Sequence, residues 1–173
     1  MTDASETTFT AENLNLLYQL STRLAKSFDL SSATEQILSL AGEYLETDRG
    51  SLVILEDNEP VNVALMVNDR ILHNNPAQFV GVVRRGLVAW VIETREAAFV
   101  NNTNIDPRWL KRPDDSPERT GVKSAMCFPL VLDDKVFGVL TVVHPGENFF
   151  SETQFNFLQT AAETATIAIR NSL

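Results

Sequence analysis

The stretch that decides the fold is KSAMCFPLVLDDKVFGVLTVV, residues 123–143. Two runs of apolar and β-branched residues, 124–132 and 135–143, flank the pair Asp133-Asp134, a residue type that favours tight turns. This pattern predicts an antiparallel hairpin. Both faces of both strands are largely apolar, and such a sheet needs cover on each face. The hairpin therefore predicts one antiparallel sheet between two covering layers.

Helical patterns lie at the two ends of the chain. The first begins near residue 11 and carries apolar residues in steps of three and four. The second is predicted from Ser32, with Glu35 completing a capping box, and the last from Ser151, with Gln154 as its partner. These terminal helices are expected to form one of the two layers.

The middle of the chain predicts the rest of the sheet and the second layer. Residues 51–56 and 61–67 are expected to pair as strands, and residues 76–94 to be helical. A brief strand, 97–100, precedes the polar, proline-containing segment 101–120. A loop of that length in a compact domain is typical of a functional lid or of a disordered segment.

Composition excludes several classes of protein. The chain has 173 residues, a net charge of −9 and one cysteine, so neither an internal disulfide nor a zinc cluster of paired cysteines is possible. The acidic balance argues against a nucleic-acid partner. No apolar run is long enough for a membrane span, and the polar start has no pattern of a secretion signal. We expect a flexible tail at 1–10, a single domain at 11–173, and a cytoplasmic location.

A small-molecule pocket is expected between the sheet and the 101–120 loop. The stretch from Phe99 to Trp109 mixes hydrogen-bonding side chains with aromatic rings and an Asp–Arg pair, as binding pockets do. In the strand 124–132, alternate residues share a face, and the face of the polar Ser124 is assigned to the pocket. The expected lining residues are Trp90, Phe99, Asn101, Asp106, Arg108, Trp109, Ser124, Met126 and Phe128. The residues alone favour the plainer alternative that Trp109 pins the loop and Asp106-Pro107 opens a turn.

No enzyme chemistry is predicted. No phosphate-binding loop occurs, and His73 and His144 have no neighbouring residues in a metal-binding pattern. Cys127 lies within an apolar strand, where a thiol behaves as a small hydrophobic group. We therefore expect neither catalytic residues nor a metal site.

Four segments in order resemble the GAF domain family, the ligand-sensing module of phosphodiesterases, adenylyl cyclases, phytochromes and bacterial sensor kinases. They are GLVAWVIETR (86–95), AFVNN (98–102) with DPRW (106–109), KSAMCFPL (123–130) with VFGVL (136–140), and Phe150-Ser151. The resemblance covers residues 11–173. It implies a six-stranded antiparallel sheet like that of PAS domains, a small-molecule pocket on one face, and terminal helices on the other.

In that family the terminal helices pair two subunits and pass the signal to an output domain such as a kinase, cyclase or transcription regulator. The helical seams of this chain agree with such a homodimer, in which the last helix is expected to meet the N-terminal helix both in the same subunit and across a two-fold axis. The expected interface residues are Leu14, Leu17, Leu24, Phe155, Leu158, Ala162, Ala165 and Ile169. Glutamate at Ala162 or Ala165 is expected to split the dimer and leave the sheet folded.

Departures from the family's motifs narrow the expected ligand. Only Phe150 matches the five-residue signature of cyclic-nucleotide-binding members, because His144-Pro145 and Gln154-Phe155 replace its other four residues. A bilin-binding cysteine is often followed by histidine, whereas Phe128 follows Cys127. The family's free methionine sulfoxide reductases need more than one cysteine. The resemblance thus implies a non-catalytic sensor of an unidentified small molecule, without covalent bilin or haem. The alternatives are a ligand-free dimerisation or scaffold module and, less favoured, a redox enzyme using Cys127.

Overall fold

One six-stranded antiparallel sheet forms the centre of the molecule. The computed structural model describes residues 10–26, 29–110 and 121–171. The strand order is β3-β2-β1-β6-β5-β4, and every neighbouring pair is antiparallel. The strands are β1 (Arg49–Glu56), β2 (Glu59–Val67), β3 (Arg70–Asn74), β4 (Ala98–Val100), β5 (Lys123–Leu132) and β6 (Lys135–Pro145). The α+β class and the six-stranded sheet are confirmed.

Three two-residue turns connect the hairpins. Asp57-Asn58, Asn68-Asp69 and Asp133-Asp134 all have positive φ angles, between 51° and 64°. Asp and Asn tolerate this left-handed conformation, which matches a turn to the right-handed twist of the strands. The β5–β6 hairpin is therefore confirmed. Strand β3, which follows the second turn, was not predicted from the residues.

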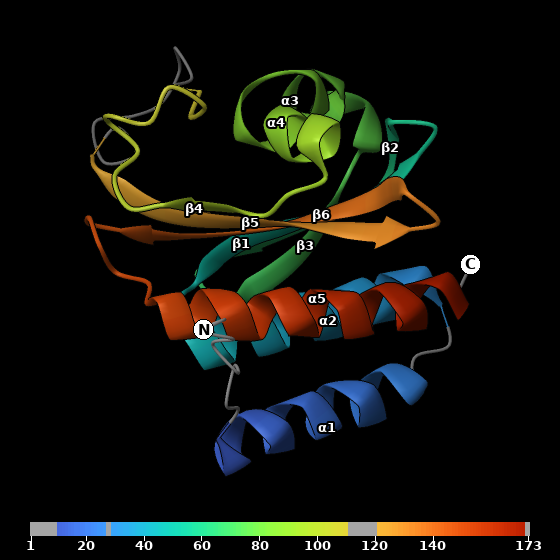
Figure 1. The fold of residues 1–173 in the computed structure, drawn as a ribbon. Coiled ribbons are helices and arrows are strands. Elements are labelled where there is room, and N and C mark those ends of the chain that lie inside the picture. The colour runs from blue at the N-terminus through green and yellow to red at the C-terminus, as the bar shows by residue number, and fades with distance from the viewer. Residues whose placement is uncertain (1–9, 27–28, 111–120, 172–173) are drawn as a thin grey trace, which may run out of the picture.

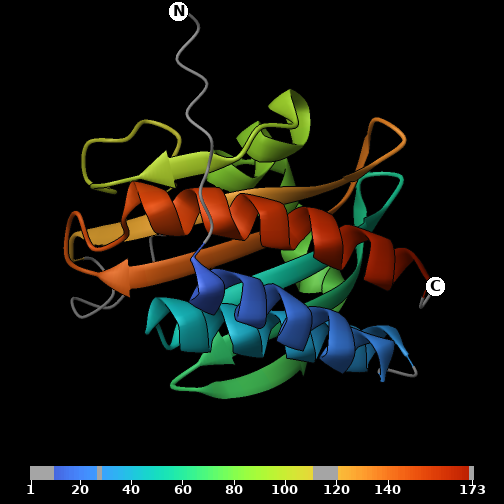
Figure 2. The same ribbon diagram turned by 60° about the horizontal axis from the view of Figure 1, so that its bottom comes forward.

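Three long helices cover one face of the sheet. They are α1 (Ala11–Ala25), α2 (Leu30–Leu45) and α5 (Glu152–Asn171). Figure 1 shows α2 and α5 side by side beneath the sheet, with α1 below them as an outer layer. Figures 1 and 2 also show that α1 and α5 run in the same direction, so α1 begins and α5 ends at opposite ends of this layer.

Side-chain caps fix where these helices begin. Ser151 and Gln154 form the predicted capping box of α5, in which each backbone N–H donates to the other's side chain, at 2.9 and 3.1 Å. The predicted start of α2 is wrong, because Asp29, not Ser32, is the N-cap. The carboxylate of Asp29 accepts a hydrogen bond from the Ser32 backbone N–H at 2.7 Å, and this bond lowers the pKa of Asp29.

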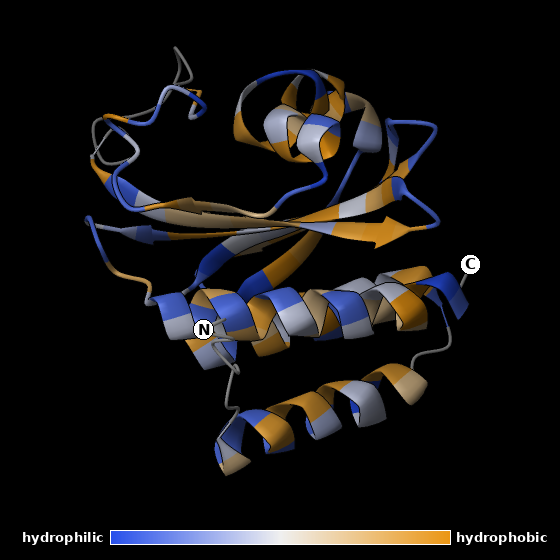
Figure 3. Cartoon of the chain, in the orientation of Figure 1, coloured by the Kyte–Doolittle hydropathy of each residue, from blue (hydrophilic) through white to orange (hydrophobic). Residues whose placement is uncertain are grey.

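Shorter elements cover the other face. They are the 3₁₀ helix η1 (Pro76–Phe79), α3 (Val80–Arg84), α4 (Gly86–Thr94) and the loop 101–110. In Figure 1 the green α3 and α4 lie above the sheet, opposite α2 and α5. The strands in Figure 3 are largely apolar while the turns at their ends are polar. The described residues contain no helix that is both long and apolar enough to cross a membrane.

Candidate functional site

The strand register arranges side chains in rows on the face beneath α3 and α4. Residues directly opposite one another on paired strands share a face. One row crosses all six strands and contains Leu72, Leu65, Ser51, Thr141, Cys127 and Ala98. The neighbouring row contains Arg70, Val67, Arg49, Val143, Ala125 and Val100. We call Arg49, Ser51, Leu65, Thr141 and Val143, at the middle of these two rows, the floor.

Cover over this face is uneven. Val53, Val63 and Val139 lie one row further along and are almost fully buried in the same core as Val91 of α4. In the rows of the floor, Val67 and Leu72 remain 42% and 54% exposed. Four of the five floor residues are only partly buried, Thr141 being the exception. The floor is therefore the part of the sheet that its covering layer leaves incompletely shielded from water.

Over the middle strands the opposite face of the sheet is closed. Side chains there lie 0–4% exposed beneath α2 and α5, including Leu52, Ile54, Ala64, Leu140 and Val142. The two faces therefore differ in kind. The helix side is a filled apolar core over the middle strands, with a polar hollow at one end beside Met66, and the other face keeps polar and partly exposed side chains over the middle strands.

The loop 101–110 is fastened beside this face by the buried Thr103. Its backbone N–H donates to the Lys123 carbonyl at 3.0 Å, and its hydroxyl accepts the Lys123 N–H at 3.0 Å. One backbone bond and one side-chain bond thus attach the loop to the first residue of β5. This attachment determines where the residues that follow Thr103 lie.

An aromatic and ionic cluster follows in the same loop. Arg108 donates two side-chain hydrogen bonds to the carboxylate of Asp106, at 3.0 and 2.7 Å. The guanidinium also lies over the ring of Trp90, 4.6 Å from its centroid. These hydrogen bonds lower the pKa of Asp106, so both partners are charged at neutral pH. Trp90 and Trp109 both pack against the core of this face.

Cys127 belongs to the core against which Trp90 and Trp109 pack, and it is fully buried. Burial raises the pKa of its thiol to about 12, although a hydrogen bond with Thr141 and the charge of Arg108 act in the other direction. Its sulfur lies 3.3 Å from the Thr141 hydroxyl. The thiol is therefore neutral at physiological pH, and the thiolate is the reactive form of cysteine.

The structure brings four of the predicted pocket residues together on this face: Trp90, Asp106, Arg108 and Trp109. Asn101 is exposed, and its carbonyl accepts the backbone N–H of Asn148. Residues 111–120 of the predicted loop lie outside the described residues. Sequence analysis missed the floor, whose signal would have been the pairing register of β1, β2 and β6 rather than any motif.

The other four predicted pocket residues lie on the helix side of the sheet, so their assignment to the pocket face is wrong. The rings of Phe99 and Phe128 each lie 5.3 Å from the ring of Phe155 in α5. Met126 is fully buried in the same core. The Ser124 hydroxyl donates to the Gly146 carbonyl and accepts the Phe149 N–H, which fastens the loop before α5. Large side chains of β5 fill the space under α5, and the small Ala125 and Cys127 face the other layer.

Most of the predicted dimer residues are also placed differently. Leu24, Leu158, Ala162, Ala165 and Ile169 are at most 5% exposed inside a single chain, and Leu17 and Phe155 pack against the same core. A residual cavity of about 30 Å³ lies among α1, α2 and α5. Of the predicted set, Leu14 alone is largely exposed, at 56%. Glutamate at Ala162 or Ala165 is therefore expected to disrupt the fold, because it would bury an unpaired charge.

Comparison with known proteins identifies the family. A family model described as GAF domain matches residues 27–170. The GAF domain of an Acinetobacter phosphoenolpyruvate-protein phosphotransferase is 20% identical, with 95% of this chain and 96% of that chain covered and a TM-score of 0.70. For the corresponding GAF domain from Coxiella burnetii the identity is 21%, the coverage 92% and 94%, and the TM-score 0.71.

Two further similarities widen the range of proteins with this fold. The free methionine-R-sulfoxide reductase of Neisseria meningitidis, solved with its substrate, is 14% identical, with 95% and 94% coverage and a TM-score of 0.68. The nitrogen fixation protein VnfA of Azotobacter vinelandii is 25% identical over 130 residues, which are 74% of this chain. The match spans a quarter of VnfA. Because the family model spans most of this sequence, the chain belongs to the GAF domain family.

Proposed function

We propose that this GAF domain is a non-catalytic sensor that binds a small molecule over the floor. The difference between the two sheet faces over the middle strands carries the proposal, since one is a closed core there and the other is incompletely covered. An aromatic ring and a paired arginine stand beside the floor, and the floor itself contains hydroxyl groups, the mixture that orients small ligands. A cytoplasmic location and an attached output domain belong to this proposal.

The absence of catalysis is also part of the proposal. The fold is shared with methionine sulfoxide reductases, so the fold alone does not decide the matter. This chain has one cysteine, and its thiol is buried and neutral. A disulfide-forming cycle within one chain needs a second thiol. These observations disfavour the redox alternative.

The structural change caused by a ligand on this face is proposed to be transmitted to the surface of the domain through α1, α2 and α5. Thr47, just beyond α2, donates its hydroxyl to the Val143 carbonyl at 2.5 Å. Val143 is a floor residue, so this bond joins the strand beneath the proposed ligand to the end of a long helix. The exposed side of α1 would then meet a second copy of the chain and report the change.

A thermal-shift screen tests binding. The purified domain is heated with cyclic nucleotides, amino acids, haem and bilins, and a ligand that prefers the folded state raises the melting temperature. Arg108→Gln is expected to reduce the rise given by a compound that binds this face. Arg95→Gln is the matched control, because Arg95 pairs with the exposed Asp134 and carries the same charge.

A compound that stabilises both variants and the parent chain equally would place binding elsewhere. NMR then distinguishes the ligand-free alternative. If none of the compounds moves the amide signals of Ser51, Thr141 and Val143, the domain is better described as a dimerisation or scaffold module.

A further inference from the structure

We propose that the molecule bound over the floor carries an oxyanion, a carboxylate or a phosphate, and that Arg49 receives it. This inference rests on the proposed function and specifies the chemistry of its ligand. Arg49 is the first residue of β1 and is only partly exposed. Its guanidinium forms no hydrogen bond or ion pair with any residue that the structure describes.

The condition of Arg49 differs from that of other arginines in the domain. Arg84 pairs with Glu59 at 2.6 Å, and Arg108 pairs with Asp106 at 2.7 Å. Arg49 is partly withdrawn from water without such a partner. A partly buried guanidinium loses hydrogen bonds to water, and no described residue replaces them for Arg49. An oxyanion would replace them with two parallel charge-assisted hydrogen bonds.

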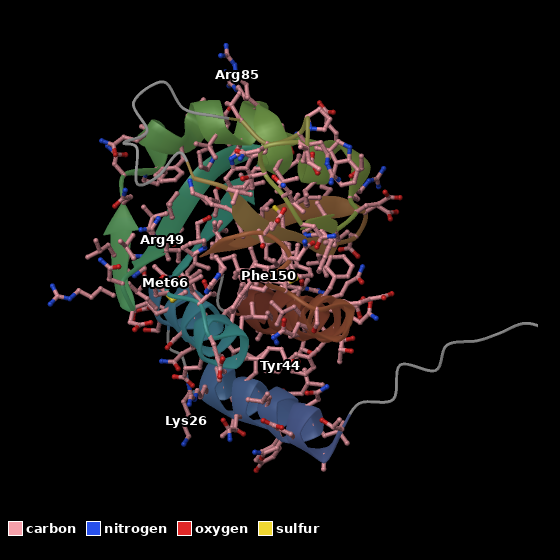
Figure 4. All side chains as sticks on the ribbon, turned by 90° about the vertical axis from the view of Figure 1, so that its left-hand side faces the viewer. Lys26, Tyr44, Arg49, Met66, Arg85 and Phe150 are labelled. Atoms are coloured by element: carbon pink, nitrogen blue, oxygen red, sulfur yellow. The ribbon has the colours of Figure 1, made fainter. Side chains whose placement is uncertain are left out.

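Charge at this end of the sheet is divided between its two faces. Arg49 and Arg70 lie in the same row on the floor side, at the middle and the edge of the sheet. Acidic side chains gather on the other face, where Glu43, Glu46, Asp48 and Asp69 help to line a polar hollow beside Met66. Figure 4 shows Met66 next to α2, with Arg49 farther from that helix. The chain as a whole has a net charge of −9, but the floor side of this end of the sheet carries positive charge that attracts an anion.

The position of Arg49 relative to the aromatic cluster suits a small molecule. Arg108 lies near Cys127, and two strand spacings separate Cys127 from Ser51 through Thr141. That is about 10 Å, since neighbouring strands lie about 4.8 Å apart. Arg108 is already neutralised by Asp106, which leaves Arg49 to receive the charge. The body of the ligand would lie over the hydroxyls of Ser51 and Thr141.

The test follows the Arg49 side chain by NMR. The Nε–Hε signals of the whole 173-residue chain are recorded as sodium phosphate or sodium acetate replaces sodium chloride at constant ionic strength. The Arg49 signal is expected to shift saturably with one or both anions. Comparison of the two arms shows whether a phosphate or a carboxylate is preferred.

Two arginine variants give the matched control. Arg49→Gln is expected to weaken anion binding at least about tenfold, and Arg49→Lys to weaken it less because the charge remains. Arg85→Gln makes the same charge change at an exposed residue between α3 and α4, which Figure 4 shows on the outside of the molecule. It should bind anions as the parent chain does. Circular dichroism of each variant confirms that it is folded.

Two results would overturn the inference. One is an Arg49 signal that responds to about 20 mM phosphate and acetate no more than to chloride, since that concentration fills a millimolar site. The other is equal anion binding by Arg49→Gln and the parent chain. If a neutral compound moves the Ser51 and Thr141 amides while neither anion does, the sensor proposal stands and the assignment of Arg49 fails.

Discussion

At the scale of single residues, the Cys127 thiol gives the clearest dependence on pH. Its pKa is about 12 in the folded chain, against an ordinary value of 9.0. Between these values the unfolded chain loses the proton and the folded chain keeps it, so stability falls as pH rises through that window. We expect the melting temperature to drop as the pH rises above 9, and to drop less in Cys127→Ala.

The same burial predicts slow labelling of Cys127. A thiol reagent at neutral pH should modify the native protein only as fast as the core opens. In denaturant the reaction should be complete at once. Labelling of the folded protein within seconds would contradict the buried position and reopen the redox alternative.

Residue-level patterns predicted where β5 lies but not which way it faces. Every side chain from Ser124 to Phe128 is small or apolar, so their alternation does not show which face of the strand packs under the long helices. The polar Ser124 predicts a ligand face, whereas in the structure its hydroxyl holds the loop before α5 in place. Side-chain size was the better signal, because Met126 and Phe128 need the deeper core under α5.

At the scale of elements, two glycines predict opposite effects of the same substitution. A methyl group at Gly50 in β1 would lie 2.8 Å from the Thr141 carbonyl oxygen of β6, and that backbone is held in the ladder. Gly50→Ala should therefore destabilise the fold, by about 1–3 kcal/mol. At Gly81 in α3 nothing lies within 4 Å, so Gly81→Ala should stabilise it by about 0.5–1 kcal/mol. Urea unfolding measures the free energy of unfolding of both variants, and changes of the same sign would contradict the predicted difference between Gly50 and Gly81.

The elements themselves were predictable where local chemistry was strong. The Asp133-Asp134 turn and the Ser151 capping box both predicted their elements correctly. Strand β3 was missed because it is a short edge strand with only Ile71 and Leu72 as apolar residues. For α2, Ser32 and Asp29 are both good caps three residues apart, and only the structure shows that Asp29 accepts the bond.

At the scale of the whole molecule, the exposed side of α1 is the remaining candidate for a homodimer. Leu14 and Tyr18 are 56% and 71% exposed and stand one helical turn apart, so they share a face. Sedimentation at tens of micromolar, the range of weak dimers, should show a dimer. Leu14→Glu should dissociate it and leave the sheet folded.

Ile105→Glu serves as the control for this substitution. Ile105 is 80% exposed and lies in the loop 101–110, on the other side of the sheet from α1. It should not alter the association. A parent chain that sediments as a monomer at these concentrations would remove the dimer from the sensor proposal.

The helical seams predict apolar stripes correctly, but most of the residues expected between subunits are buried within one chain. A stripe such as Leu158, Ala162 and Ala165 indicates that one side of the helix is covered, but it does not indicate whether the same chain or a second chain covers it. Here α1 and α2 of the same chain take that place. The expected contact of α5 with the N-terminal helix is present within one chain, and its repetition across a two-fold axis stays a prediction.

The shared direction of α1 and α5 has a mechanical consequence. A polypeptide that enters the helix layer through α1 leaves it through α5 at the far end, and α5 alone, with 20 residues, is about 30 Å long. Domains joined to this one before α1 and after α5 would therefore lie at opposite ends of the helix layer, along one axis. A torque applied at one end of the layer would pass along the packed helices α1 and α5 to its other end, and the sheet would lie beside this path.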